Sequence, residues 1–257
     1  MKITWLGTAS ILIESEDTRI LFDPFVELAG GSNPNTLEDF RGVTDICITH
    51  GHVDHLFFVP QLIEEQDATV HCPSPAAVTL EGWLEECGNV VRTLPGESWQ
   101  VGGIRLRTHM GAHVPFTPCL AMRTLLQMRN LRYWRNALFL AWAHPRFPEK
   151  GETLVYEIEA EGKRVLLLGS MALDPDTVYP EGADLLILPF QGRREPEREA
   201  CRIVERLKPR RVLLDHFDDA FPPVSRQEDT RRLCRLMKER FPQVKAAKPV
   251  AGKGIFI

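Results

Sequence analysis

A motif of metal-ligand residue types occupies residues 48–55, which read I-T-H-G-H-V-D-H. Three imidazoles and one carboxylate fall within six consecutive positions; they belong to His50, His52, Asp54 and His55. Imidazole and carboxylate are the usual non-thiolate ligands of Zn²⁺ and related ions, and ligands within one turn converge at little cost in loop entropy. The alternative is a solvated polar turn in which Asp54 caps the following helix. Because the chain has only eight histidines, we favour a metal site.

The motif lies where a strand is expected to give way to a helix. Residues 44–49, T-D-I-C-I-T, have the length and apolar character of a short buried strand, and residues 56–65 are expected to form a helix. As the chain turns between them, the first two histidines can point one way while Asp54 and His55 come round from the turn. We therefore expect the ligands to meet at the carboxyl end of this strand.

The rest of the chain mixes strand and helix patterns. Two hairpins are expected, with turns at Gly102-Gly103 and Glu161-Gly162. Expected strands and hairpins cover residues 2–6, 10–14, 18–25, 98–110, 152–170, 184–190 and 211–216, and expected helices cover residues 75–86, 195–207 and 226–240. Strands before, between and after helices predict an α/β layered architecture with mixed sheets. We find no linker or repeat and expect one domain over residues 1–257.

Composition limits the class of protein. Of the 257 residues 44% are hydrophobic, enough for a sizeable core, and the net charge of -4 gives no electrostatic footprint for nucleic acid. No apolar run reaches the roughly 18 residues that a membrane span needs, and the N-terminal stretch lacks a signal-peptide pattern. The six scattered cysteines form no C-x-x-C pair, so we expect reduced core thiols in a cytoplasmic protein.

The run H-G-H-V-D-H at residues 50–55 resembles the signature of the metallo-β-lactamase superfamily. The stretches W-L-G-T-A-S at 5–10 and R-I-L-F-D-P-F at 19–25 are similar to its metal-dependent hydrolase branch, which includes proteins similar to ascorbate-6-phosphate lactonase. The resemblance covers residues 1–113 and 151–257. It implies a four-layer αβ/βα sandwich of two mixed sheets flanked by helices, with a metal site along one edge and a helical insertion at about 116–150.

Carried over position by position, the resemblance implies two ligand sets. The first set is His50, His52 and His113. The second set is Asp54, His55 and His216. For the third position of the first set, His113 matches best and His109 is the fallback.

The chain departs from the family pattern at Ser170. A bridging aspartate is expected after an apolar strand and a glycine, but residues 166–170 read L-L-L-G-S. A neutral hydroxyl lacks the negative charge that makes two close cations tolerable. One metal in the three-histidine site, replacement of the charge by Asp174 or a phosphate-bearing substrate, and loss of metal chemistry all stay open. We favour one tight ion and a weak second one, zinc or alternatively manganese or iron.

These residues suggest a metal-activated water that attacks a small ester, lactone or phosphodiester. Asp54 would act as general base when the second site is empty and as a ligand when it is filled. Asp23 is a candidate to hydrogen-bond a ligand histidine, and Arg193 is a candidate to bind a substrate phosphate or carboxylate. The alternative is a catalytically silent metal- or ligand-binding module of the same fold, which Ser170 supports.

Residues 120–144 show a long apolar helix pattern in which arginines are the only charges. We expect this helix to be a lid over the pocket or a homodimer interface, and we rank contact with a membrane surface behind both. The expected partner is a small-molecule substrate, and no nucleic-acid partner is expected.

Overall fold

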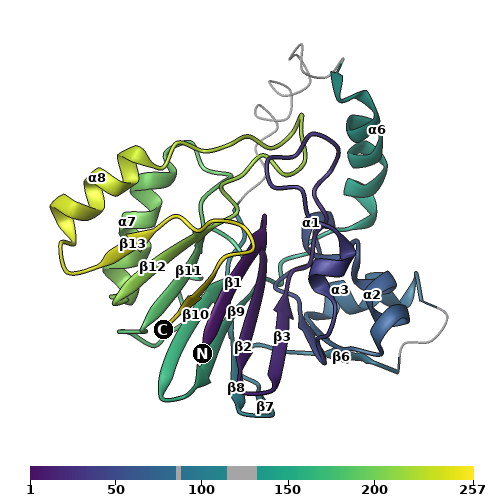
Figure 1. Cartoon of the computed structure of the whole chain (residues 1–257), viewed down its shortest axis with the longest axis horizontal. Helices are drawn as coiled ribbons and strands as arrows, with labels where there is room; N and C mark the ends of the chain where they lie inside the picture. The colour runs from purple at the N-terminus through teal and green to yellow at the C-terminus, as the bar shows by residue number, and fades with distance from the viewer. Residues whose placement is uncertain (85–87, 115–131) are drawn as a thin grey trace.

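Two seven-stranded sheets lie face to face with helices on their outer sides (Figure 1). This computed structural model describes residues 1–84, 88–114 and 132–257. In the first sheet the strand order is β14-β1-β2-β3-β4-β5-β6, and in the second it is β13-β12-β11-β10-β9-β8-β7. The layers confirm the predicted αβ/βα sandwich with two mixed sheets.

Each sheet joins an antiparallel part to a parallel part. The first comprises β1 (Lys2–Gly7), β2 (Ser10–Ser15), β3 (Thr18–Phe22), β4 (Asp45–Cys47), β5 (Thr69–Cys72), β6 (Val90–Arg92) and β14 (Gly254–Phe256). The second comprises β7 (Ser98–Val101), β8 (Ile104–Met110), β9 (Leu154–Ala160), β10 (Lys163–Leu168), β11 (Leu185–Pro189), β12 (Arg211–Asp215) and β13 (Lys245–Ala247). Strands β3 to β6 are parallel, as are β10 to β13, so their carboxyl ends lie at common edges.

The helices of the described residues lie along the outer sides of the two sheets, with one of them at the margin of the molecule. They are η1 (Leu37–Phe40), α1 (Val53–Leu56), α2 (Val59–Gln66), α3 (Ser74–Glu81), α6 (Trp134–Ala143), η2 (His144–Arg146), α7 (Pro196–Leu207) and α8 (Arg231–Arg240). Figure 1 shows α7 and α8 beside the second sheet, and α1, α2 and α3 beside the first.

Alternation along the strands divides the core in two. In β2, Ile11 and Ile13 point into the cluster between the sheets, whereas Leu12 joins the cluster under α1, α2 and α3. Successive strand side chains face opposite sides, so a strand buried on both faces reads as a continuous apolar run. The short apolar runs found in the sequence are therefore strands that are buried on both faces.

Several predicted boundaries differ from the structure. The hairpins at 98–110 and 152–170 are confirmed as β7–β8 and β9–β10. The single helix expected at 56–65 is instead two, because α1 ends at Leu56 and α2 begins at Val59. The helix expected from residue 226 begins at Arg231, and that expected at 75–86 ends at Glu81, with 85–86 outside the described residues. A longer helix is expected at 120–144. Its residues 120–131 lie outside the described residues, and α6 begins at Trp134.

The cysteines partly match the expectation of core thiols. Cys47, Cys72 and Cys201 are free and buried, but Cys234 is exposed on α8, where the helix turns that residue to solvent. Cys87 and Cys119 lie outside the described residues. None of the helices in the described ranges is long and apolar enough to cross a bilayer.

Candidate metal centre

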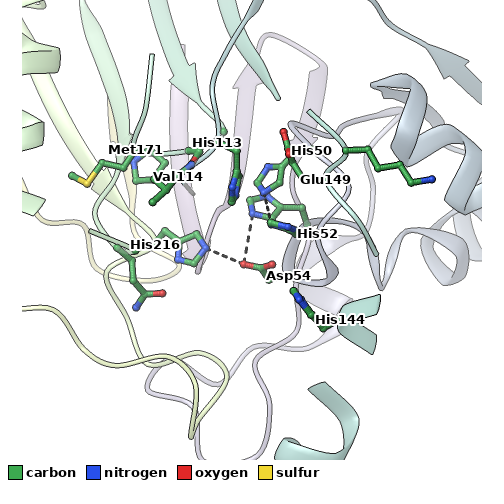
Figure 2. Close-up of a pocket in the computed structure, with 16 residues that line it drawn as sticks. His50, His52, Asp54, His113, Val114, His144, Glu149, Met171 and His216 are labelled. Atoms are coloured by element: carbon green, nitrogen blue, oxygen red, sulfur yellow. Dashed lines mark hydrogen bonds and ion pairs between the residues drawn. The ribbon is translucent and has the colours of Figure 1, made fainter. Parts of the chain in front are cut away.

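Two groups of ligand-type side chains meet in one pocket at the edge of the sheets (Figure 2). The three-histidine cluster is His50, His52 and His113. The mixed cluster is Asp54, His55 and His216. Within each cluster the possible ligand atoms lie within 4.8 Å of one another. The residues that the resemblance placed together are therefore together in space, although up to 166 positions separate them in the chain (216 − 50).

Strand ends bring these side chains to the pocket. His50 follows β4, His52 is the N-cap of α1, and His113 follows β8. His52, not Asp54, holds the cap position, so the polar-turn alternative in which Asp54 caps a helix is wrong. Asp54 is instead free to face the pocket from the first turn of α1.

Two of the site residues turn sharply off their strands. Asp23 directly after β3 and His216 directly after β12 have left-handed φ angles of 45° and 51°. Such backbone costs on the order of 1 kcal/mol or more in non-glycine residues and persists only where neighbours hold it. Here the Asp23 N–H donates to the Cys47 carbonyl at 3.1 Å, and the His216 N–H donates to the Thr8 carbonyl at 2.7 Å. The turns aim both side chains into the site.

The three-histidine cluster is packed as neutral imidazole. Nε2 of His50 lies 3.1 Å from Nδ1 of His52, and the His113 ring centroid is 4.8 Å and 4.5 Å from those two rings. Burial lowers the pKa of His50 well below its ordinary value, lowers that of His52 to about 3, and also lowers that of His113. Neutral rings offer the lone pairs that a transition-metal ion requires.

The mixed cluster carries charge. Nε2 of His216 lies 3.0 Å from Oδ2 of Asp54, and Nε2 of His55 is 3.6 Å from the same oxygen. Burial opposes ionisation of Asp54, but His55 and the bond from His216 outweigh it and hold the pKa of this carboxyl well below its usual range. Burial likewise opposes a charged His216, but the bond to Asp54 and the nearby carboxylates raise its pKa to about 9.

Asp23 and Thr49 orient one histidine of each cluster through contacts with its Nδ1 atom. Asp23 accepts the Thr49 N–H at 2.8 Å and the Thr49 hydroxyl at 2.7 Å, and its Oδ2 lies 3.0 Å from Nδ1 of His55. The Thr49 hydroxyl is also 3.0 Å from Nδ1 of His50. Since that hydroxyl donates to Asp23, it accepts the proton of His50 Nδ1, which leaves Nε2 of both histidines as the free nitrogen. Asp23 therefore contacts His55, one of the candidate ligands.

Gly169 allows this arrangement, because a Cβ at residue 169 would lie 2.5 Å from Cβ of Thr49. The next residue, Ser170, lines the pocket as expected for the altered bridging position. Its hydroxyl accepts the Val114 N–H at 3.2 Å and so ties the segment after His113 to the end of β10.

Three other residues singled out from the sequence are not members of the two clusters. Nε2 of His109 is 3.0 Å from Glu157 on the neighbouring strand β9. Asp174 accepts the Thr177 hydroxyl at 2.7 Å within its own turn. Arg193 donates to the Met171 carbonyl at 3.3 Å and lines a second cavity beside the pocket with Val114. Arg193 is thus near the site, whereas His109 and Asp174 are engaged elsewhere.

The pocket has a volume of about 530 Å³, and sequence reasoning missed part of its wall. Glu149, Lys150 and His144 line it together with Met171 and Gln191. Glu149 accepts the Thr153 hydroxyl at 2.9 Å, and its charge acts against the effect of burial on His113. No motif marks Glu149 and Lys150, because their approach to the pocket depends on how the loop after η2 packs.

A family model described as the beta-lactamase superfamily domain matches residues 18–217. The chain belongs to this superfamily. A UPF0173 protein of Pyrococcus furiosus is 28% identical over 249 residues, which are 94% of this chain and 97% of that protein. A UPF0173 metal-dependent hydrolase of Brucella ovis is 36% identical over 127 residues, 49% of each chain. Together with the family match, these relatives confirm the prediction of a metal-dependent hydrolase of the metallo-β-lactamase superfamily.

Solved structures agree on the fold. The metallo hydrolase Igni18 of Ignicoccus hospitalis superposes with a TM-score of 0.67, at 17% sequence identity, over 99% of this chain and 97% of that one. At this identity the likeness establishes the sandwich architecture alone.

Proposed function

We propose that this protein hydrolyses a small ester, lactone or phosphodiester with the help of one tightly bound divalent cation held by His50, His52 and His113. The main support is the pair of facing nitrogens, 3.1 Å apart, on two buried imidazoles whose pKa values are depressed. Two neutral rings whose nitrogens approach so closely can turn their lone pairs to a shared cation, and three imidazoles suit zinc, manganese or iron.

A divalent ion held by these histidines would lower the pKa of a bound water towards neutrality and would polarise a carbonyl or phosphoryl oxygen. The chain's own residues do the rest. Asp54 stays ionised at neutral pH and is suited to accept a hydrogen bond from the attacking water, which orients it. His216 holds a proton 3.0 Å from Asp54 and can donate it to a leaving oxygen.

The mixed cluster is the proposed weaker second ion site. Its ligands are complete in number, but a cation there must displace the proton of His216. Ser170 contributes a hydroxyl, and no bridging carboxylate, to the pocket wall. We therefore infer that this site is filled only at high metal concentration or when substrate supplies the missing negative charge.

The pocket suits a small substrate. About 530 Å³ lies within the range of small-molecule sites, and the wall combines Met171 and Val114 with the polar ends of Lys150 and Gln191. Lys150 offers a positive charge for a phosphate or carboxylate group. A cytoplasmic location, expected from the unpaired cysteines, completes the proposal.

The decisive test uses protein purified without chelator. It measures the metal content of this protein and its rate of hydrolysis of model substrates. We expect about one tightly held equivalent and turnover of model esters, lactones or phosphodiesters, both lost in His52→Ala. His109→Ala is the matched control, since that histidine bonds to Glu157 outside the clusters. If no metal binds after zinc or manganese is added, the silent-module alternative holds and the proposal fails.

A further inference from the structure

Helix α6 carries an apolar edge that faces solvent in the described part of the protein. Trp134, Leu138 and Trp142 are 54%, 62% and 42% exposed. Their spacing of four residues places them one above the other along one side of the helix. Trp83, also 42% exposed, lies with its ring centroid 5.7 Å from that of Trp142 and widens the same surface. We call these four residues the tryptophan edge.

The opposite side of α6 is anchored, so the tryptophan edge has a fixed position. The Phe139 ring lies 4.9 Å from that of Phe57. Asn136 is buried and donates to the carbonyls of Ala29 at 3.0 Å and Pro222 at 2.8 Å. Figure 1 shows α6 standing at the margin of the molecule, above α1 and α3. The helix is thus held by its inner face and presents a rigid outer one.

The charges on α6 and beside both of its ends are positive, whereas Trp83 lies two residues from Glu81, which pairs with Arg92. Arg132, Arg135 and Arg146 flank the tryptophan edge, and no Asp or Glu occurs from residue 114 to residue 148. The Arg135 guanidinium lies 5.4 Å from the centre of the Trp134 ring, and that of Arg146 lies 4.7 Å from the centre of the Trp142 ring. Arginine beside tryptophan suits a boundary where the ring enters an apolar layer and the cation stays among phosphates.

We propose that the tryptophan edge docks onto a phospholipid surface that contains anionic headgroups. Exposed tryptophans with basic neighbours are the composition of helices that lie in the membrane interface. A second copy of the chain fits less well, because a twofold axis would set the arginines of one α6 against those of the other with no acidic partner in the helix. An anionic bilayer complements the apolar residues and the arginines together.

The docking would place the pocket close to the bilayer. Helix α6 passes directly into η2, and His144, Glu149 and Lys150 just beyond it line the cavity of the candidate metal centre. The inference stands on the exposure and charge of α6 and does not rest on hydrolysis.

Sedimentation with vesicles of phosphatidylcholine, with or without phosphatidylglycerol, tests this docking on the full chain. We expect binding to the vesicles that contain phosphatidylglycerol, weaker binding at high salt, and a blue shift of tryptophan fluorescence. Leu138→Glu should weaken binding roughly tenfold or more, and Arg135→Glu by roughly fivefold or more. Val178→Glu, at a valine that is 89% exposed elsewhere, is the matched control and should bind like the parent.

Three outcomes would overturn the proposal. One is an absence of binding to either vesicle. Another is equal binding by the parent chain and Leu138→Glu, with both folded by circular dichroism. The third is a dimer in analytical ultracentrifugation that Leu138→Glu dissociates, without any vesicle binding, because the tryptophan edge would then be a contact between copies.

Discussion

The three-histidine cluster and the mixed cluster share a pocket but differ in the protons they hold. Burial drives His50, His52 and His113 towards the neutral form. In the mixed cluster, the Asp54 carboxylate keeps a proton on His216, whose pKa is raised to about 9. One carboxylate placed among the ligands therefore reverses the charge state of the neighbouring imidazole.

This difference predicts the order in which cations enter. Ligands must be deprotonated to bind a metal, so proton release weakens binding at neutral pH. The three-histidine cluster needs no such release, and its two nearest nitrogens already face each other. The mixed cluster must release the proton of His216 before a cation can bind. Unequal affinity thus follows from this chain's own residues, in addition to the effect of Ser170.

Removing one ligand from each cluster should have the largest effect and should separate the roles of the two clusters. We expect His113→Ala to remove the tight ion and to lower the hydrolysis rate about a hundredfold or more, because the activated water is lost. His216→Ala should keep the tight ion, lose the weak metal binding, and lower the rate only through the loss of its proton donation to the leaving oxygen. Metal stoichiometry and steady-state rates of both variants measure this. An equal loss of tight metal in the two would show that the clusters bind as one unit.

The pH dependence of stability should show both proton states in the metal-free protein. The folded pKa of His216, about 9, lies above the ordinary value of about 6.5, so its contribution is complete below pH 6.5 and is lost as the pH rises to 9. The loss amounts to at most about 3 kcal/mol of unfolding free energy. The pKa values of His50 and His52 are lower in the folded protein than in the unfolded chain. Their contribution to stability is therefore present above pH 6.5 and is lost as the pH drops below 6.5.

Urea denaturation of metal-free protein at several pH values measures these slopes. His216→Asn, which keeps a polar side chain without the titration, should flatten the alkaline limb and leave the acid limb unchanged. A parent protein with equal stability at pH 6.5 and pH 9 would contradict the charge state assigned to the mixed cluster.

Asp23 supports both clusters, and its loss should affect both. Asp23→Asn removes the acceptor for Nδ1 of His55 and weakens the hold on Thr49, so metal affinity should fall by roughly ten- to a hundredfold. Thr49→Val removes the hydroxyl partner of His50 but leaves the Asp23 carboxylate beside His55, so it should cost roughly tenfold, mainly in the tight site. Titration with a fluorescent zinc competitor separates the two. Tight affinity unchanged in both variants would exclude this supporting role.

Restoring a carboxylate at the altered position should have the smallest effect. Ser170→Asp supplies negative charge between the clusters and should raise the affinity of the second ion by about tenfold. Ser170→Asn keeps an oxygen that can accept the Val114 N–H but adds no charge, so it serves as the control. Calorimetric metal titration measures the second binding step. Equal second-step affinities would indicate that residue 170 does not face the ions.

Much of the site was readable from the sequence, but by two different routes. The dense motif at residues 50–55 pointed to a metal on its chemistry alone, because ligand types seldom crowd together without one. His113 and His216 came from family resemblance, since nothing local marks a histidine at a strand end as a ligand. The structure unites the two routes by placing both strand ends at one edge of the sandwich.

Other features could not be predicted for physical reasons. Thr49 ends an apolar run, and its hydroxyl matters only because Gly169 and Asp23 approach it from distant strands. The apolar pattern continues through Phe57 and Phe58, so periodicity did not reveal the break between α1 and α2. The short strands β6, β13 and β14, with three residues each, are defined by their partners in the sheets rather than by their own pattern.

The ligands of the three-histidine cluster come from opposite layers of the sandwich. His50 and His52 follow a strand of the first sheet, and His113 follows a strand of the second. A cation shared among them would clasp the two halves of the molecule at their rim, as a covalent cross-link would. Holding the metal and resisting thermal separation of the layers would then be a single property, and chelation should lower the melting temperature as well as the rate.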